Sequence, residues 1–295
     1  ALLVVLVAII NGLVHWARRK KSYNIRLNQA HQDKTKRKVL HGKKKLLGYS
    51  IVGIPLLGGL IFPIAQLIYW AVLSFEMFAD SNLIQLVVES FSIAFVAALC
   101  IIFTALAFIY FSRWNFINKI HFFKRIATIG YVLPGAIIGI GIIRSNQSVI
   151  NFFHETLNLE IGYLFYGSSI ILIYAYVFRF LAVAYNPIEA NTLKLGKYLH
   201  ESSYLLGNSK LKTLFKIELP LLQNTLISSF LLVFIDILKE LPLTLILKPY
   251  NIQTLAVSAY EYADDERVAE AAIPALILVL VILILMVVLK LAEKK

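Results

Sequence analysis

The segment 196–220 combines residue types and spacings that suit binding at a membrane surface. An acidic residue, two small residues, a glycine and an Ile-x-Leu-Pro group follow one another there: Glu201, Ser202, Ser203, Gly207, Ile217, Leu219 and Pro220. Glycine readily adopts the left-handed conformation that ends a helix, so the chain is predicted to turn at Gly207. A basic run, 209–216, then leads to Pro220, and proline is tolerated in the first turn of a helix. The spacing predicts a helix, a bend and a second helix on the membrane surface; a basic amphipathic surface loop is the alternative.

Four charged residues lie in apolar segments. Placing a charged side chain near the centre of a bilayer costs about 2.5 to 3.5 kcal/mol of insertion free energy, so each of them needs a partner or a polar cavity. Asp236, Lys239 and Glu240 fall in the segment 220–247, and Arg179 falls in the preceding apolar segment. The spacing places Lys239 and Glu240 on roughly the helical face of Asp236, so Asp236 and Lys239 can neutralise each other. We expect this face to point inward, where the cluster lines a conduit or its outer gate, or forms an internal ion-pair network. Arg179 is expected to pair with a carboxylate or to extend to the interface.

The elements that carry these residues are predicted to be membrane-spanning helices. The chain has 295 residues, of which 59% are hydrophobic, and several apolar runs approach the roughly 20 residues needed to cross a bilayer. Pro242, near the end of one run, predicts a kink. The composition indicates an all-α polytopic membrane protein. The predicted spans are 1–17, 47–73, 86–111, 126–144, 163–186, 220–247 and 273–291.

Charge alternates between successive loops. Basic residues dominate the loops 18–45, 112–125 and 186–219, whereas acidic residues dominate the loops 74–85, 145–162 and 248–272. Because cytoplasmic loops of membrane proteins carry an excess of Lys and Arg, the first three loops are predicted to be cytoplasmic. The segment 196–220 therefore falls on the cytoplasmic side.

The segment 18–46 is predicted to be a basic cytoplasmic linker. Between residues 18 and 45, twelve Lys or Arg side chains accompany one acid, Asp33, which gives this stretch a net +11 of the chain's +12. Such a run can also mark a nucleic-acid patch. Its position between two spans favours contact with anionic lipid headgroups instead, so the bilayer is the expected partner and no nucleic acid is expected.

Two further segments carry recognisable patterns. The run 131–141 contains Pro134 and the pair Gly135 and Gly139, which predict a bend and close helix packing within the chain, with helix dimerisation as the alternative. The segment 255–274 is predicted to be an acidic amphipathic element on the outer face.

The sequence offers no chemistry for catalysis. Gly196-Lys197 has neither the upstream glycine nor the following hydroxyl residue of a phosphate-binding loop. The six histidines lie in linkers and loops without metal-ligand spacing, and the single cysteine, Cys100, leaves no intrachain disulfide. We therefore expect no enzyme activity, no metal site and no cofactor on this chain.

The pattern around Glu201 and Gly207 resembles the EAA motif, the cytoplasmic loop by which bacterial ABC importer permeases dock onto their ATP-hydrolysing subunit. The spacing matches throughout, and the small pair is Ser-Ser where the family usually has Ala-Ala. The resemblance implies that Glu201, Ser202, Ser203, Gly207, Ile217, Leu219 and Pro220 couple the chain to the ATPase. Small side chains at Ser202 and Ser203 would permit close approach to its groove.

The segments 239–244, 260–267 and 270–276, with 131–141 and 179–184, look like the C-terminal half of double-length iron(III) importer permeases. This resemblance implies a six-span type I ABC importer transmembrane domain over 47–295, preceded by one extra span at 1–17 that would be the last span of a preceding permease half. A natural seven-span protein is the alternative for that first span.

What the resemblance implies is import across the bacterial inner membrane, with ferric iron as the expected substrate. The implied partners are an ATPase dimer that binds ATP and Mg, a second permease half in the same full-length chain, and an external substrate-binding protein. Permeases for thiamine, polyamine or aminoethylphosphonate share much of this architecture and remain alternatives. An ion-coupled secondary transporter that uses Asp236 and Glu240 is the alternative from another class.

Overall fold

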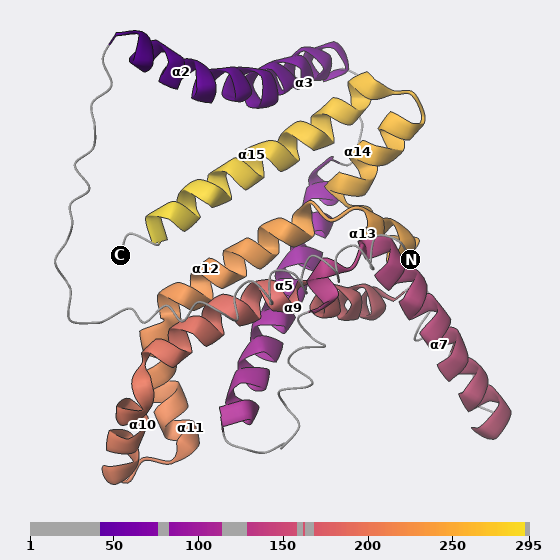
Figure 1. The fold of residues 1–295 in the computed structure, drawn as a ribbon. Coiled ribbons are helices and arrows are strands. Elements are labelled where there is room, and N and C mark those ends of the chain that lie inside the picture. Colours follow the sequence, from indigo (N-terminus) through magenta and orange to yellow (C-terminus); the bar gives the residue numbers. More distant parts are fainter. Residues whose placement is uncertain (1–41, 76–82, 114–128, 158–161, 163–167, 293–295) are drawn as a thin grey trace, which may run out of the picture. The chain divides into compact units, whose positions relative to one another are not determined.

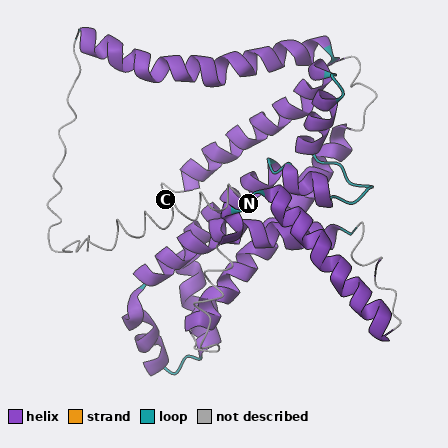
Figure 2. Ribbon diagram, turned by 45° about the vertical axis from the view of Figure 1, so that its right-hand side comes forward, coloured by secondary structure: helices purple, strands orange, loops and turns teal. Residues whose placement is uncertain are grey.

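The computed structural model describes residues 42–75, 83–113, 129–157, 162 and 168–292 of the chain. Figure 2 shows that this part of the chain consists of helices and the loops that join them. The helices, of which Figure 1 labels the α-helices, are α2 (Lys43–Leu56), η1 (Leu57–Ile61), α3 (Phe62–Leu73), α5 (Leu83–Arg113), η2 (Gly130–Val132), α7 (Gly135–Leu157), α9 (Ser169–Lys194), α10 (Gly196–Leu205), α11 (Lys210–Thr213), η3 (Leu214–Glu218), α12 (Leu219–Leu238), α13 (Pro242–Leu247), α14 (Leu255–Asp264) and α15 (Val268–Ala292).

The chain divides into two units, Ala1–Gln66 and Leu67–Lys295. The described part of the first unit holds α2, η1 and the beginning of α3. Its helix contains Pro55 and continues into a π-helical stretch, η1. A proline removes one backbone donor from the helical ladder, and a π-helical turn is one way in which a helix accommodates such an interruption.

The core of the second unit forms where α5, α9 and α12 pack against one another. Small residues on α5 allow this close approach, because Ala97, Ala98 and Ala105 are fully buried at helical spacing. Leu172 on α9 and Val233 on α12 are fully buried as well. Alanine-rich faces of this kind bring helix backbones close together in membrane proteins.

The structure confirms the all-α fold and contains, within the described residues, five helices long and apolar enough to cross a membrane. Four of the predicted spans, 47–73, 86–111, 163–186 and 273–291, lie within these helices or overlap them, and a fifth, 220–247, overlaps one of them only as far as Leu238. The five helices are Lys43–Leu73, Leu83–Arg113, Ser169–Lys194, Lys210–Leu238 and Val268–Leu291. The predicted first span at 1–17 and the linker up to residue 41 lie outside the described residues.

The predicted span 126–144 differs from the observed helix. Within the described residues, α7 begins only at Gly135 and continues to Leu157, and it is not one of the five candidate spans. Leu133 adopts an extended conformation (φ −75°, ψ 138°), as expected for a residue that precedes a proline. Pro134 therefore separates the short turn η2 from α7.

The predicted span 220–247 is wrong as a single element. Its helix runs continuously from Lys210 to Leu238 and then stops, and α13 begins at Pro242. Lys239 leaves the helical conformation (φ −94°, ψ 0°). The expected kink at Pro242 is thus a complete break, since proline initiates the new short helix rather than bending the old one.

Candidate functional site

The segment 196–220 forms the predicted helix, bend and helix. α10 ends at Leu205, and Gly207 lies in the left-handed region (φ 77°) before α11 begins at Lys210. The turn is closed by backbone hydrogen bonds from Gly207 N to Tyr204 O (2.9 Å) and from Asn208 N to Ser203 O (3.2 Å). A Cβ atom at Gly207 would meet nothing within 4 Å. The requirement for glycine is therefore conformational, as the sequence predicts.

Residues 196–213, here called the clip, are fastened together by a small buried polar network. The Ser203 hydroxyl lies 2.8 Å from the Thr213 hydroxyl, and Asn208 Nδ2 donates to Ser203 Oγ at 3.3 Å. Ser203 and Thr213 are both buried. The sequence suggests that Ser202 and Ser203 both face a partner, but only Ser202 is exposed. Ser203 instead joins α10 to α11.

The tip of the clip exposes large apolar side chains. Leu205 and Leu206, which precede Gly207, are 88% and 82% exposed. Glu201 is exposed on α10, and Lys210 and Lys212 are exposed on α11. Apolar side chains framed by charges are typical of a protein interaction surface.

The second half of the motif lies in a continuous helix. Ile217 lies in the π-helical turn η3. Leu219 and Pro220 are the first two residues of α12, so Pro220 lies in its first turn, as predicted. Ile217 and Leu219 are half-buried, whereas Pro220 is exposed. The basic run 209–216 is thus the start of the membrane-crossing helix and not a separate surface element.

The residue between Ile217 and Leu219 contacts a second helix. The carboxylate of Glu218, a residue only 3% exposed, accepts a hydrogen bond from Tyr110 OH at 2.5 Å. Arg113 Nη1 lies 3.3 Å from the same oxygen, Glu218 Oε2. Both partners belong to the last turn of α5, and the guanidinium of Arg113 lies 6.0 Å from the centre of the Tyr110 ring. Sequence reasoning missed this cluster, although the i, i+3 spacing of Tyr110 and Arg113 and the acid in an apolar run were visible signals.

The intramembrane charges separate into two ion pairs. Lys239 Nζ lies 2.9 Å from Asp236 Oδ1, which confirms the expected pairing. Glu240 does not share this pair, because the helix ends before it. Its Oε2 lies 3.1 Å from Arg179 Nε on α9. Arg179 therefore pairs with a carboxylate, one of its two expected roles.

The Arg179–Glu240 pair is surrounded by hydrogen bonds at the helix break. Arg179 Nη1 donates to the carbonyl of Leu133 at 2.6 Å, and the backbone N–H of Leu243 donates to Glu240 Oε1 at 3.2 Å. Glu240 is 7% exposed. Three segments, the residue before Pro134, the middle of α9 and the start of α13, thus meet at one ion pair, in which Glu240 is buried and Arg179 is half-buried.

Small and hydroxyl side chains complete the same region. Tyr176 OH lies 2.6 Å from Thr244 Oγ1, and Thr244 donates to the carbonyl of Glu240 at 2.6 Å. A Cβ atom on Gly135 would lie 2.5 Å from Glu240 Oε1, and one on Gly139 would lie 3.1 Å from Ile246 Cγ2. The two glycines thus pack inside the chain, as expected. Tyr176 and Thr244 were not singled out from the sequence.

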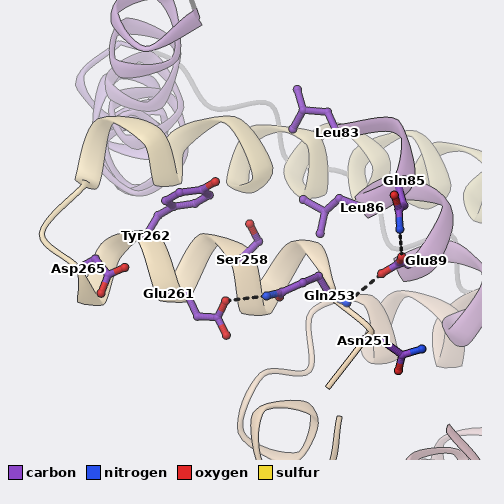
Figure 3. Close-up of a pocket in the computed structure, with 10 residues that line it drawn as sticks. All are labelled: Leu83, Gln85, Leu86, Glu89, Asn251, Gln253, Ser258, Glu261, Tyr262 and Asp265. Atoms are coloured by element: carbon purple, nitrogen blue, oxygen red, sulfur yellow. Dashed lines mark hydrogen bonds between the residues drawn. The ribbon is translucent and has the colours of Figure 1, made fainter. Parts of the chain in front are cut away.

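A pocket lies at the other end of α5, between that helix and α14 (Figure 3). Gln253 bridges the two sides, because its backbone N–H donates to Glu89 Oε2 (2.9 Å) and its side chain donates to Glu261 Oε2 (3.0 Å). Lys248 Nζ lies 3.3 Å from Glu261 Oε1. The polar lining residues are Gln85, Glu89, Asn251, Gln253, Ser258, Glu261 and Asp265.

The turn after α14 carries one more charged contact. Arg267 donates from Nε to Glu270 Oε1 at 2.8 Å and from Nη2 to Glu270 Oε2. The hydrogen bond to Glu270 and the attraction of that carboxylate raise the pKa of Arg267 above its ordinary value.

The pocket and the contact with Glu218 lie at opposite ends of α5. Glu89 lines the pocket and Arg113 contacts Glu218, and 24 residues of α5 separate them. At a rise of 1.5 Å per residue this is about 36 Å, enough to cross the hydrocarbon core of a bilayer. This placement agrees with the loop charges, which assign the two ends to opposite sides of the membrane.

Within the part of the chain that the structure describes, no group of three or more His, Cys, Asp or Glu side chains is placed to hold a metal ion.

The fold is that of a type I ABC importer transmembrane domain. The chain superposes on a chain of a bacterial alginate ABC transporter, solved in complex with an alginate pentasaccharide-bound periplasmic protein, with a TM-score of 0.63 and 15% identity. The match covers 85% of this chain and 94% of that one.

Two sequence relatives are permeases. The chain is 25% identical over 232 residues to the Fe(3+)-transport system permease protein FbpB 2 of Haemophilus influenzae, a match that covers 77% of this chain and 43% of the relative. It is 29% identical over 218 residues to the probable transport system permease protein NifC of Clostridium pasteurianum, covering 70% of this chain and 74% of the relative. The chain thus spans less than half the length of the first relative. No protein-family model matches it.

These similarities confirm the resemblance to ABC importer permeases. The chain is a multi-pass membrane protein with the fold of an ABC importer permease domain.

Proposed function

We propose that this chain is a permease half of an ATP-driven importer and that its clip docks onto a separate ATPase subunit. The observation that supports this most strongly is the surface of the clip, where Leu205 and Leu206 are almost fully exposed beside a left-handed Gly207. The buried bonds among Ser203, Asn208 and Thr213 make this surface rigid. A rigid exposed apolar tip binds a partner with little loss of conformational entropy.

The proposed coupling residues fall into three groups. Glu201 and Ser202 face outward on α10 and are available to the ATPase. Ser203 and Gly207 set the shape of the clip, whereas Ile217, Leu219 and Pro220 join it to α12. Movement of the clip would therefore pass directly into a membrane-crossing helix.

We assign the two intramembrane ion pairs different roles. Arg179 and Glu240 form an internal pair that holds the break between α12 and α13, because each also bonds to backbone groups. Asp236 and Lys239 are the candidates for contact with a polar pathway, since the side chain of Lys239 is 59% exposed.

The proposed assembly contains two permease halves, an ATPase dimer that binds ATP and Mg, and an external substrate-binding protein. Two permease halves are proposed to form one full-length chain, since the relative FbpB 2 is more than twice as long as the part matched here. The acidic end that holds Glu89, Glu261 and Asp265 is the proposed seat for the binding protein.

The proposed substrate is ferric iron. Its support is the name of the relative from Haemophilus influenzae, an Fe(3+)-transport permease, together with similarity over 77% of this chain. Thiamine, polyamine and aminoethylphosphonate are the alternatives that a direct measurement has to separate.

The test is ATP hydrolysis by the full-length complex in lipid, measured with its ATPase and its binding protein. The binding protein is loaded in turn with ferric iron, thiamine or a polyamine. Stimulation by the ferric form alone supports both the mechanism and the substrate. Stimulation by another ligand overturns the iron assignment, and failure to bind any ATPase favours an ion-coupled secondary transporter.

A further inference from the structure

The contact between Glu218 and α5 joins two elements that the coupling motif does not connect. Glu218 closes the π-helical turn η3, directly between the clip and α12. Tyr110 and Arg113 form the last described turn of α5. The two helices are brought together here by a carboxylate that accepts from both partners.

A π-helical turn changes the register of the helix that contains it. Because an α-helix advances about 100° per residue, one extra residue rotates all later side chains by about that angle relative to earlier ones. In this chain the turn ends at Glu218, whose carboxylate is directed to Tyr110 and Arg113. π-Helical turns occur frequently at functional sites.

A polar contact of this kind transmits movement differently from the apolar packing around it. In the first half of α5, the contact with α12 is made by edge-on aromatic rings, Phe91 against Phe234 and Phe95 against Phe230. Packed apolar helices can slide past one another by small shear movements. Hydrogen bonds to one carboxylate oxygen are directional and resist such sliding.

We propose that Glu218, Tyr110 and Arg113 are a second transmission link, which makes α5 move with α12 when the ATPase displaces the clip. These three act as positioning residues and do not contact substrate. The inference rests on the proposed function, in which the clip docks onto an ATPase. It extends the coupling machinery from one membrane-crossing helix to two.

The test compares Tyr110→Phe and Glu218→Gln with Tyr185→Phe in the full-length complex in liposomes. Tyr185 is a matched control, because it is also 4% exposed and also bonds to a glutamate, but that partner, Glu189, lies on the same helix. ATP hydrolysis is measured with and without ferric-loaded binding protein, together with retention of the ATPase and with the melting temperature.

We expect Tyr110→Phe and Glu218→Gln to keep the ATPase bound and to keep basal hydrolysis, while stimulation by the binding protein falls about fivefold or more. Tyr185→Phe should keep normal stimulation. The double variant should be no worse than Glu218→Gln alone, since both changes break one link.

Other outcomes overturn the inference in distinguishable ways. If stimulation in Tyr110→Phe equals that of the unaltered complex, or if basal hydrolysis and melting temperature fall in step with it, the link is only structural. If the unaltered complex neither retains an ATPase nor responds to the binding protein, the proposed function fails first and the inference falls with it.

Discussion

Gly207 is the residue at which backbone conformation alone sets the shape of the clip. Replacing it by valine puts a β-branched side chain at a φ of 77°, a conformation that costs about 1 to 2 kcal/mol or more for such residues. We expect Gly207→Val to abolish uptake in cells while membrane insertion and protein amount are unchanged.

The control for this prediction is Gly141→Ala. Gly141 on α7 also has open space around it, but its backbone is helical, so alanine there should be neutral or slightly stabilising. Normal uptake by the Gly207→Val variant would count strongly against the coupling role of the clip.

The Arg179–Glu240 pair provides a second prediction for single residues. Removing one partner of a buried ion pair leaves an unpaired charge, which costs about 3 to 5 kcal/mol. We therefore expect Arg179→Met to lower the melting temperature of the detergent-solubilised protein strongly. The double variant Arg179→Met with Glu240→Gln should recover part of that loss, because no buried charge remains.

Lys239→Ala serves as the comparison for that pair. The side chain of Lys239 is 59% exposed, so loss of its bond to Asp236 should cost less than loss of the contact between Arg179 and Glu240. A melting temperature in Arg179→Met as high as in Lys239→Ala would contradict the structural role assigned to Arg179 and Glu240.

Among the elements, the short turn η2 depends on its glycine for contact with α9. A Cβ atom on Gly130 would lie 2.1 Å from the backbone oxygen of Phe178, and a backbone atom cannot rotate away. Gly130→Ala should therefore push η2 off α9 and destabilise the protein by about 1 to 3 kcal/mol, the usual range for overpacking. Thermal unfolding of Gly130→Ala beside Gly141→Ala measures the effect, and equal melting temperatures would show that α9 yields at this position.

The elements also show where sequence patterns stop being informative. Apolar length predicted four of the candidate spans, because burial in lipid needs a long apolar run whatever the packing. It did not reveal that the kink predicted at Pro242 is a complete break after Leu238, or that Glu240 at this break pairs with Arg179 from elsewhere in the chain. For the same reason, the contact of Glu218 with α5 was not predictable from the motif.

Across the molecule as a whole, sequence spacing predicted local backbone features best. In the segment 196–220 it predicted the turn at Gly207 and the proline at the start of α12. It did not predict that Ser203 is buried against Thr213, because side-chain burial depends on how α10 meets α11. Local conformation is thus readable from spacing, whereas the partners of polar side chains require the tertiary fold.

The orientation of the molecule in the membrane yields a direct prediction, because the chain has one cysteine. In a Cys100→Ser background, Tyr250→Cys places a thiol at a fully exposed position in the loop before α14, and Leu206→Cys places one at the tip of the clip. A membrane-impermeant maleimide should label Tyr250→Cys in intact spheroplasts, since the acidic end faces outward. It should label Leu206→Cys only after the membrane is opened, and a bound ATPase should slow that labelling. Labelling of Leu206→Cys in intact spheroplasts would reverse the orientation and remove the clip from the side where ATP is available.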